Sequence, residues 1–444
     1  MTTLTDLEAR APVATVAAPP RRVPRPVPAG SPEPLPAWPI QMLLVGYPIW
    51  WALGVTPFIV SIAGMVMGVM LLMRRGLKIV PGTIPWFAFV LWVIPCAFAI
   101  DSAVRLIGFG QRTANLLAIG IALLYALNAR ERLTATRIIN SITCFWVFVI
   151  VGGYLGTLRP GFRLTTPVGL LLPAGITSNP LVYDLVFPPF AEVQQPYGAE
   201  TAFARPAAPF PYTNGWGCAI AWLTPVAIAC ILRTRSKAVR GMLAFVLVAA
   251  AVPALGTLNR GMFLGLGLAV VYVSVRLLLR GKVLPFLAVT VVGLIAAVGF
   301  LVSGLGSGIE SRTEVSETNT GRATVYQETF DRTLRSPVIG YGAPRPSETL
   351  VISVGTQGFL WMAMFSYGFV GVGLFLWFLW GVVWRTRNPP DTAGLWLHAA
   401  LVVPCMTIFY YGIDPMLMLS MVLVAAVLLP GGRREPAEPE PAPQ

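Results

Sequence analysis

The chain has 444 residues, of which 56% are hydrophobic and only 11% are charged, and its mean hydropathy is +0.71. Soluble globular domains are not normally so apolar, so this composition excludes that class and indicates a polytopic α-helical membrane protein. The net charge of +13 would suggest nucleic-acid binding in a soluble protein. Here the basic residues lie in short loops between apolar segments, where they set the membrane orientation, and no nucleic-acid partner is expected.

Both ends of the chain are polar and rich in proline. Residues 1–37 lack the apolar core of a signal peptide and contain several arginines, so they are predicted to be a disordered tail that stays in the cytoplasm. Residues 431–444 form a Pro/Glu run of the same character. The sequence therefore predicts two cytoplasmic tails that flank a transmembrane domain over residues 38–430.

Twelve apolar segments between the tails are each about long enough for the roughly 30 Å hydrocarbon core of a bilayer. They lie near residues 38–53, 55–73, 84–100, 109–127, 138–157, 214–232, 241–257, 262–280, 283–303, 356–384, 394–411 and 414–430. The prediction is an all-α fold with about twelve transmembrane helices.

Basic residues are distributed unevenly among the connections. With the N-terminus inside, every short basic cluster falls on the inner side, as the positive-inside rule requires. The clusters are Arg74, Arg75 and Lys78; Arg130, Arg132 and Arg137; Arg233, Arg235, Lys237 and Arg240; Arg276, Arg280 and Lys282; and Arg385 and Arg387. Two connections on the outer side are long, about 158–213 and about 304–355. Long loops often carry function, and insertion topology does not explain the dense charge of the second.

Two polar segments are predicted to form amphipathic helices. Residues 101–112 are too polar for the bilayer centre and are predicted to be an interfacial helix before the fourth span. Residues 321–336 carry an apolar stripe with spacings of three and four, which is predicted to lie on the membrane or on the helix bundle. The stripe consists of Ala323, Tyr326, Phe330 and Leu334. The arginines that this helix would leave near headgroup depth are Arg322, Arg332 and Arg335.

Arg260 stands at the N-terminal end of the eighth predicted span, between Asn259 and Gly261. Unpaired N–H groups and the helix dipole favour an anion at such a position. A guanidinium adds a planar fork that suits phosphate oxygens. Position alone supports equally the alternative that Arg260 only extends its charged end to the outer interface.

Three stretches resemble the O-antigen ligase and O-antigen polymerase superfamily. Asn259-Arg260-Gly261 resembles the Ser-Arg-Gly motif that opens a span in that family. Gly321-Arg322, followed by Pro337-Val338-Ile339-Gly340-Tyr341-Gly342, resembles its Arg … Pro-Leu-Leu-Gly-x-Gly loop, and residues 359–371 resemble the span that follows. The resemblance covers roughly residues 255–385, and it rests on the order and spacing of the pieces together.

The resemblance implies a fold like that of the type C glycosyltransferases and an enzyme that needs no metal or other cofactor. The family transfers glycans from an undecaprenyl diphosphate carrier to an acceptor on the outer face of the bacterial cytoplasmic membrane. The implied partners are an undecaprenyl-diphosphate-linked glycan, an acceptor glycan or lipid, and membrane lipid. Arg260 and Arg322 are implied to contact the diphosphate. Further candidate substrate-binding residues in the outer loop are Arg332, Arg335, Arg345 and Tyr341.

The chain departs from the family pattern just before the tenth span, where the family usually has His-Asn and this chain has Gln357-Gly358. Glutamine cannot accept a proton as histidine does, but Gln357 could orient an acceptor hydroxyl, so it is the third candidate catalytic residue. The single histidine, His398, is expected near the cytoplasmic end of the eleventh span, where it is predicted to be structural. The candidate bases are Glu310, Glu314, Glu317, Asp331, Glu348 and Asp414.

Two other function classes remain open from the sequence. Twelve spans also suit a transporter of a polysaccharide precursor or another anionic solute, although the two halves show no convincing repeat and the predicted spans contain almost no acids. A sensor or scaffold would leave the outer arginines unexplained. The five cysteines show no CxxC spacing, so neither a disulfide framework nor a zinc site is predicted.

Overall fold

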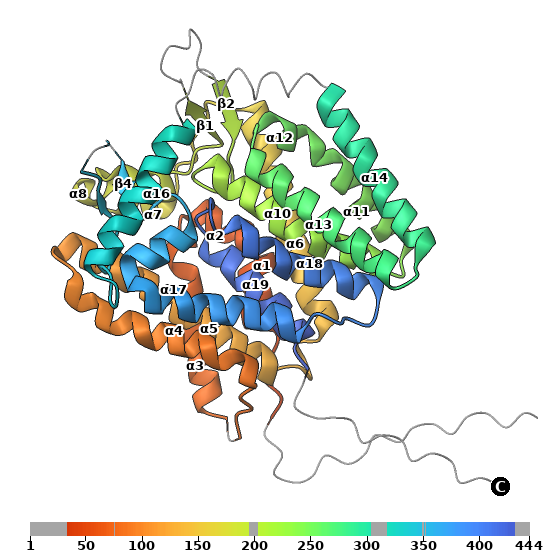
Figure 1. Ribbon diagram of the computed structural model, residues 1–444, viewed down its shortest axis with the longest axis horizontal. Coiled ribbons are helices and arrows are strands. Elements are labelled where there is room, and N and C mark those ends of the chain that lie inside the picture. The colour runs from red at the N-terminus through yellow and green to blue at the C-terminus, as the bar shows by residue number, and fades with distance from the viewer. Residues whose placement is uncertain are drawn as a thin grey trace, which may run out of the picture. The chain divides into compact units, whose positions relative to one another are not determined.

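The computed structural model describes residues 33–74, 76–194, 203–302, 318–348, 350 and 352–430, and their elements are labelled in Figure 1. The α-helices are α1 (Trp38–Val45), α2 (Tyr47–Leu53), α3 (Thr56–Leu72), α4 (Ile84–Val93), α5 (Ala103–Asn128), α6 (Ala135–Leu158), α7 (Pro167–Leu171), α8 (Ala174–Thr177), α9 (Pro180–Val186), α10 (Thr213–Arg233), α11 (Lys237–Ala249), α12 (Ala251–Gly256), α13 (Arg260–Leu279), α14 (Val283–Val302), α16 (Thr318–Arg335), α17 (Phe359–Arg385), α18 (Thr392–Thr407) and α19 (Pro415–Leu428). Two 3-10 helices, Pro81–Thr83 and Ile94–Ala99, flank α4.

Two small antiparallel hairpins complete the described structure. Strand β1 (Ala191–Gln194) pairs with β2 (Phe203–Pro206), and β3 (Arg345–Pro346) pairs with β4 (Ser353–Val354). The first hairpin lies in the connection between α6 and α10, and the second lies between α16 and α17. The tails predicted for residues 1–37 and 431–444 fall almost wholly outside the described residues.

Helix α10 lies at the centre of the bundle, where it packs against α6, α13 and α18. It is apolar on all sides, which is the composition expected of a helix surrounded by others. A second group is formed by α3 with α5, α4 with α17, and α5 with α19. Gly64 lets α3 approach α5 closely, because a Cβ at this position would lie 2.3 Å from the Cβ of Ala118.

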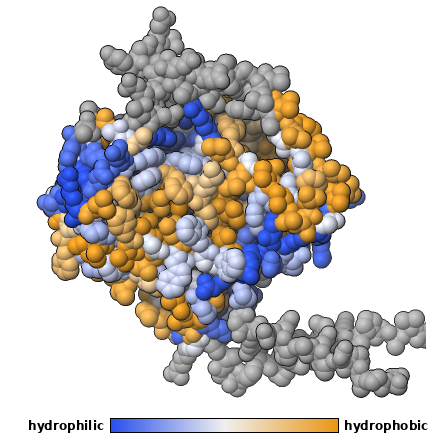
Figure 2. All heavy atoms as spheres, in the orientation of Figure 1, coloured by the Kyte–Doolittle hydropathy of each residue, from blue (hydrophilic) through white to orange (hydrophobic). Residues whose placement is uncertain are grey.

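Seven helical segments are long and apolar enough to cross a membrane, so the described structure is that of an all-α membrane protein. The segments are Pro81–Ala99, Ala103–Asn128, Ala135–Leu158, Thr213–Arg233, Lys237–Gly256, Arg260–Leu279 and Phe359–Arg385. Shorter apolar helices lie over the other five predicted spans, and the first of these is divided into α1 and α2. The count of twelve spans therefore stays a prediction. Figure 2 shows hydrophobic residues over much of one face, with hydrophilic residues gathered over α16.

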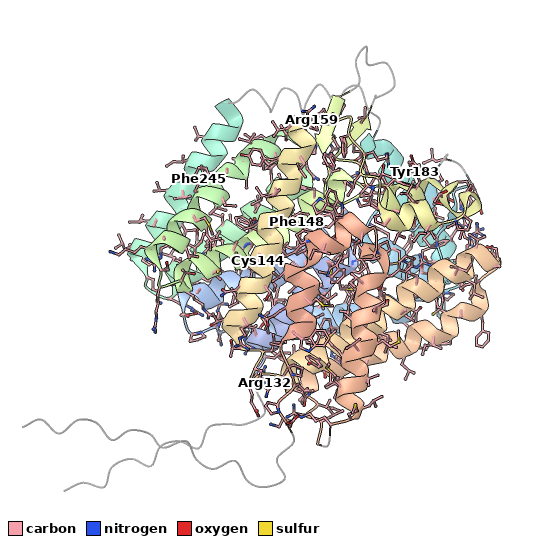
Figure 3. The ribbon with its side chains drawn as sticks, turned by 180° about the vertical axis from the view of Figure 1, so that it is seen from behind. Arg132, Cys144, Phe148, Arg159, Tyr183 and Phe245 are labelled. Carbon is pink, nitrogen blue, oxygen red and sulfur yellow. The ribbon has the colours of Figure 1, made fainter. Side chains whose placement is uncertain are left out.

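The basic connections meet at one end of the bundle. Arg74 donates to the carbonyl of Asn128 at 2.9 Å, and Arg130 donates to the carbonyl of Leu429 at 2.7 Å. Arg233 pairs with Asp391 at 3.4 Å. These contacts join connections that the basic-loop pattern assigns to the same side. Figure 3 shows Arg132 and Arg159 at opposite ends of α6.

The helix predicted over residues 101–112 is continuous with the fourth predicted span. Residues 103–128 form the single helix α5, whose start is capped by the Ser102 hydroxyl, which accepts from the Arg105 amide. Arg105 pairs with Asp101 at 2.6 Å on the first turn. The polar first half continues into the apolar second half through Gly108 and Gly110, because no proline ends the helix between them.

Helix α17 is interrupted at Gly368, whose backbone has a φ of 70° and a ψ of −176°. The segment that follows α16 lies against this break. The amides of Tyr341 and Gly342 donate to the carbonyls of Phe365 and Ser366 at 2.9 and 2.8 Å. The amide of Phe369 donates to the carbonyl of Pro337 at 2.8 Å. The 337–342 segment thus supplies hydrogen bonds that an interrupted helix inside a bilayer protein requires.

We predict that Gly368→Ala strongly destabilises the protein. A Cβ at this position would lie 2.2 Å from the Val338 carbonyl oxygen, and the positive φ is itself unfavourable for alanine. The expected loss exceeds about 2 kcal/mol, measured as a lower melting temperature in detergent. Gly373→Ala on the same helix is the control, since a Cβ there would meet nothing within 4 Å. Equal melting temperatures for the two variants would contradict the proposed constraint.

A second prediction concerns membrane orientation. In a cysteine-free background, a membrane-impermeant maleimide should label Arg159→Cys in intact cells, and should label Arg132→Cys only after permeabilisation. The reason is the positive-inside pattern of the basic connections. Labelling of Arg132→Cys in intact cells, and of Arg159→Cys only after permeabilisation, would show that the orientation is the reverse of the predicted one. Labelling of both positions from one side would mean that α6 does not cross the bilayer.

Candidate functional site

The helix that begins at Arg260 is capped by the preceding residue. The side-chain oxygen of Asn259 accepts from the amide of Met262, so α13 starts at Arg260, the position expected from the sequence. Asn259 is buried, whereas Arg260 is exposed. Tyr411 donates from its hydroxyl to the same Asn259 oxygen. The start of α13 is therefore held from the side by the chain that follows α18.

Gly261 is required by the close approach of two tyrosines. A Cβ at this position would lie 2.5 Å from the ring of Tyr410 and 2.8 Å from the hydroxyl of Tyr411. The Tyr410 hydroxyl also donates to the Gly261 carbonyl at 3.4 Å. The glycine after Arg260 thus has a packing role, and the segment 408–411 covers the first turn of α13.

The same 408–411 segment holds the beginning of α17. The amide of Phe359 donates to the carbonyl of Tyr411 at 2.7 Å, and the indole of Trp361 donates to the carbonyl of Phe409 at 2.8 Å. Gly358 has a φ of 148°, and a Cβ there would lie 2.5 Å from the Phe409 oxygen. Gln357 is therefore positioned at the edge of this segment, although it lies about a hundred residues after Arg260 in the sequence.

Helix α16 reaches this region through Tyr326. The Tyr326 ring stacks on Trp361 with ring centroids 4.4 Å apart, and its hydroxyl donates to the Gln357 carbonyl at 3.2 Å. Burial raises the pKa of Tyr326, and the nearby charge of Arg322 opposes that rise. Arg322 lies one helical turn before Tyr326. Tyr326 thus connects Arg322 with Gln357, and Trp361 connects Tyr326 with the 408–411 segment, which contacts the start of α13.

Arg332, Tyr341 and Arg345 form a different cluster. The guanidinium of Arg345 lies 4.6 Å from the Tyr341 ring centroid, and the Tyr341 ring stacks on Phe365 at 4.7 Å. The guanidinium carbon of Arg332 lies 5.3 Å from the Phe365 ring centroid. The backbone carbonyl of Arg332 accepts a hydrogen bond from the Tyr341 hydroxyl. The cluster packs the 337–342 segment onto the interrupted helix α17.

The polar contacts of Arg332 and Arg345 are also made within the protein. Arg332 pairs with Glu328 at 3.1 Å and donates to the Pro346 carbonyl at 2.9 Å. Arg345 donates to the Ala99 carbonyl at 2.9 Å. Burial alone would raise the pKa of Glu328, but hydrogen bonds from Ser347, the Glu348 amide and Arg332 together lower it.

The remaining candidate residues do not lie together. The Arg335 side chain is 67% exposed and lies 3.9 Å from Glu348, so it belongs to neither cluster. Asp331 is exposed on α16. Glu310, Glu314 and Glu317 lie outside the described residues. Asp414 caps α19 by accepting from the Met416 amide at 2.8 Å, and it follows the 408–411 segment directly.

The apolar stripe predicted for α16 is not the buried face of that helix. Phe330 and Leu334 are about half exposed, whereas Val325, Thr329 and Thr333 are buried. The two threonines can be buried because each hydroxyl donates to the backbone carbonyl four residues earlier. The prediction that the stripe packs on the bundle is therefore wrong, except at Tyr326 and along the edge of Phe330. The ring centroids of Phe330 and Phe369 are 5.9 Å apart.

His398 is a structural residue, as its position predicts. It is 1% exposed, and its Nε2 lies 2.9 Å from the Val383 carbonyl. Since that carbonyl can only accept, Nε2 carries the proton, and Nδ1 accepts from the Tyr272 hydroxyl at 2.6 Å. Both ring nitrogens are thus used in packing α18 against α13 and α17.

The sequence alone did not single out Tyr410, Tyr411 or Trp361, which assemble the site. A signal was present, since the two adjacent tyrosines stand at the end of an otherwise apolar span. Two adjacent tyrosines at such a position bury their rings, and their hydroxyl groups then need hydrogen-bond partners. A scan against protein-family models, a search of curated proteins and a search of solved structures each found no match to this chain.

We predict that Arg332→Ala destabilises the protein while Arg335→Ala does not. Removing Arg332 leaves the largely buried Glu328 carboxylate without its cation and opens the stack on Phe365, at a cost on the order of 3 kcal/mol. Removing the exposed Arg335 should cost less than about 0.5 kcal/mol. Melting temperatures in detergent test this, and similar values for both variants would contradict the structural role of Arg332.

Proposed function

We propose that this protein is a glycan transferase that moves an oligosaccharide or polysaccharide from a polyprenyl diphosphate to an acceptor. The observation that carries the proposal is the contact chain from the start of α13, through Tyr410, Tyr411 and Trp361, to Tyr326 beside Arg322. It connects Asn259-Arg260-Gly261, Arg322 and the beginning of the 359–371 stretch, which are three parts of the resemblance to the O-antigen ligase and polymerase superfamily. Arg332 and Arg345, by contrast, have packing roles.

The chemistry requires few groups from the protein. An acceptor hydroxyl oxygen bonds to the anomeric carbon of the donor, and the bond from that carbon to the diphosphate oxygen breaks. The hydroxyl proton passes to a base or to solvent, and the leaving diphosphate takes the bonding electrons. Arg260, at a helix start, and Arg322 would neutralise the charge that develops on the diphosphate. Gln357 would orient the acceptor hydroxyl by hydrogen bonding.

The proposed setting is the outer face of a bacterial cytoplasmic membrane. The donor arrives as a lipid-linked glycan, so its diphosphate lies at headgroup depth, where the positive-inside pattern would put the start of α13 and the helix α16. The exposed stripe residues Phe330 and Leu334 would then contact the bilayer. The polyprenyl tail would lie in a groove between apolar helices.

The test is glycan transfer by the purified protein in liposomes from a short polyprenyl diphosphate oligosaccharide. Arg260→Ala and Arg322→Ala should each lower kcat/KM by about 10²-fold, the scale for losing one charge-stabilising group. The two losses should combine to less than their product, because both groups act on one diphosphate. The lysine variants should retain more activity than the alanine variants.

Arg159→Ala is the matched control, since Arg159 is an exposed arginine at the end of α6 and has no role in the proposed site. Its rate should equal that of the wild type. Wild-type rates for the Arg260 and Arg322 variants would defeat the mechanism. Strictly multiplicative losses would assign the two arginines to different steps. Flux of the lipid-linked glycan or another anion, without a new glycosidic bond, would instead favour a transporter.

A further inference from the structure

A cavity of about 170 Å³ lies where α2, α3, α5 and α19 meet the connection between α6 and α10. Its polar lining includes Tyr47, Gln111, Arg112, Asn115 and Asp414. Tyr47 belongs to α2, Gln111, Arg112 and Asn115 belong to α5, and Asp414 lies in the turn before α19, so the polar groups converge from different parts of the chain. The proposed diphosphate site does not use any of them.

Two buried side chains present unused hydrogen-bonding groups to this cavity. Asn115 is 6% exposed; its oxygen accepts from Ser61 at 2.7 Å, but its amide nitrogen has no partner among the described residues. Tyr47 is 2% exposed, and its hydroxyl makes no hydrogen bond within the part of the chain that the structure describes, although the charge of Asp414 acts on it. Both residues line the cavity, so these two groups are placed to bind something that enters it.

Further donors belong to residues that line the same space, and two of their nitrogens are buried beneath its surface. The Arg112 guanidinium donates from Nη2 to the Gly342 carbonyl at 3.3 Å, while its Nε is buried without a partner among the described residues. The indole nitrogen of Trp51 is likewise buried and unpaired within the described ranges. Gln111 donates to the Pro57 carbonyl at 3.2 Å, which leaves its amide oxygen as an acceptor.

The charges that line the cavity favour a neutral ligand. Arg112 is its one lining cation among the described residues, and it is opposed by Asp414 and Asp184. Asp184 already pairs with Arg163 at 2.7 Å. Burial raises the pKa of Asp414 to about 6, so near pH 7 it is mainly an ionised acceptor of hydrogen bonds. A phosphate would meet this carboxylate, and a hydrocarbon would leave the polar groups unpaired.

The cavity is the size of one six-membered ring, and apolar residues line the rest of it. An empty cavity of about 150 Å³ in another protein holds benzene. Trp51 and Phe210 line this one together with several prolines, so apolar faces alternate with hydrogen-bonding groups. A sugar ring has the matching surface, since it carries hydroxyls that both donate and accept and C–H faces that pack on aromatic rings.

The cavity adjoins the candidate site on both sides. Asp414 follows Tyr411, whose hydroxyl donates to Asn259. Phe210 precedes Thr213, whose carbonyl accepts from the Asn259 amide at 3.4 Å. Two residues that line the cavity, Asp414 and Phe210, are therefore each three residues along the chain from a residue that contacts Asn259, the cap of α13 next to Arg260.

We propose that this cavity binds one sugar ring of the acceptor glycan, through the hydrogen-bonding groups of Tyr47, Asn115 and Asp414. This inference rests on the proposed glycan transfer, and it assigns the acceptor to a site separate from the arginines that take the diphosphate. Tyr47 and Asn115 supply donors to ring oxygens and hydroxyls, and Asp414 accepts from a hydroxyl. Trp51 and Phe210 exclude water around the ring.

The test is binding of methyl glycosides of glucose, galactose, mannose and N-acetylglucosamine to the purified full chain, by saturation-transfer NMR. At least one glycoside should bind, and Tyr47→Phe and Asn115→Leu should each raise its Kd about five- to tenfold, the scale for one lost hydrogen bond. Asn140→Leu is the control, because Asn140 is exposed on α6 and does not line the cavity. Melting temperatures check that each variant is folded.

The outcomes separate this inference from the proposed function. Absence of binding by all four glycosides, or binding that folded Tyr47→Phe and Asn115→Leu variants leave unchanged, overturns the sugar site even if glycan transfer is measured. Cavity-dependent glycoside binding by a protein that transfers no glycan refutes the proposed function and leaves the sugar site standing. Weaker glycoside binding together with a raised KM for the acceptor in the same two variants supports both the sugar site and the proposed glycan transfer.

Discussion

The arrangement of α16, α17 and the segment between them depends on the interruption of α17 at Gly368. Breaking a helix frees carbonyls and amides that water cannot satisfy inside a bilayer protein. The Phe365, Ser366 and Tyr367 carbonyls accept from the Tyr341 amide, the Gly342 amide and the Trp92 indole, and the Phe369 amide donates to Pro337. The break and the 337–342 segment therefore require each other.

This constraint also orders the residues around it. Because 337–342 is held on α17, the end of α16 is held as well, and the stack of Arg345, Tyr341 and Phe365 fills the space between them. Arg332 closes that stack from the α16 side. Arg322 lies ten residues earlier, about 15 Å away along the helix axis, so one helix carries a packing arginine at one end and a candidate site arginine towards the other. A high density of arginine in a loop is thus not by itself evidence of a binding surface.

The segment 408–411 has a comparable role on the other side of the site. It contacts the cap of α13 through Tyr411 and the first turn of α17 through Phe409, so two motifs about a hundred residues apart are fixed relative to each other. Gln357 lies beside it, at the position where the family resemblance implies a histidine. The turn that follows ends in Asp414, an acid with a pKa raised to about 6, which borders the cavity next to the α13 start. Any base that the proposed transfer needs must work within this geometry.

Local pattern in the sequence determined the class and most of the elements. An apolar content of 56% excludes a soluble domain, and the start of α13 at Arg260 and the helix of residues 318–335 follow from capping and periodicity, which act over a few residues. Only the tertiary structure decided which face of α16 is buried. Its threonines satisfy their own hydroxyls, and Arg332 finds Glu328 and Phe365, so this more polar face packs inward. The break at Gly368 and the contact of Tyr411 with Asn259 likewise join distant segments, and long-range packing of that kind leaves no periodic trace in the chain.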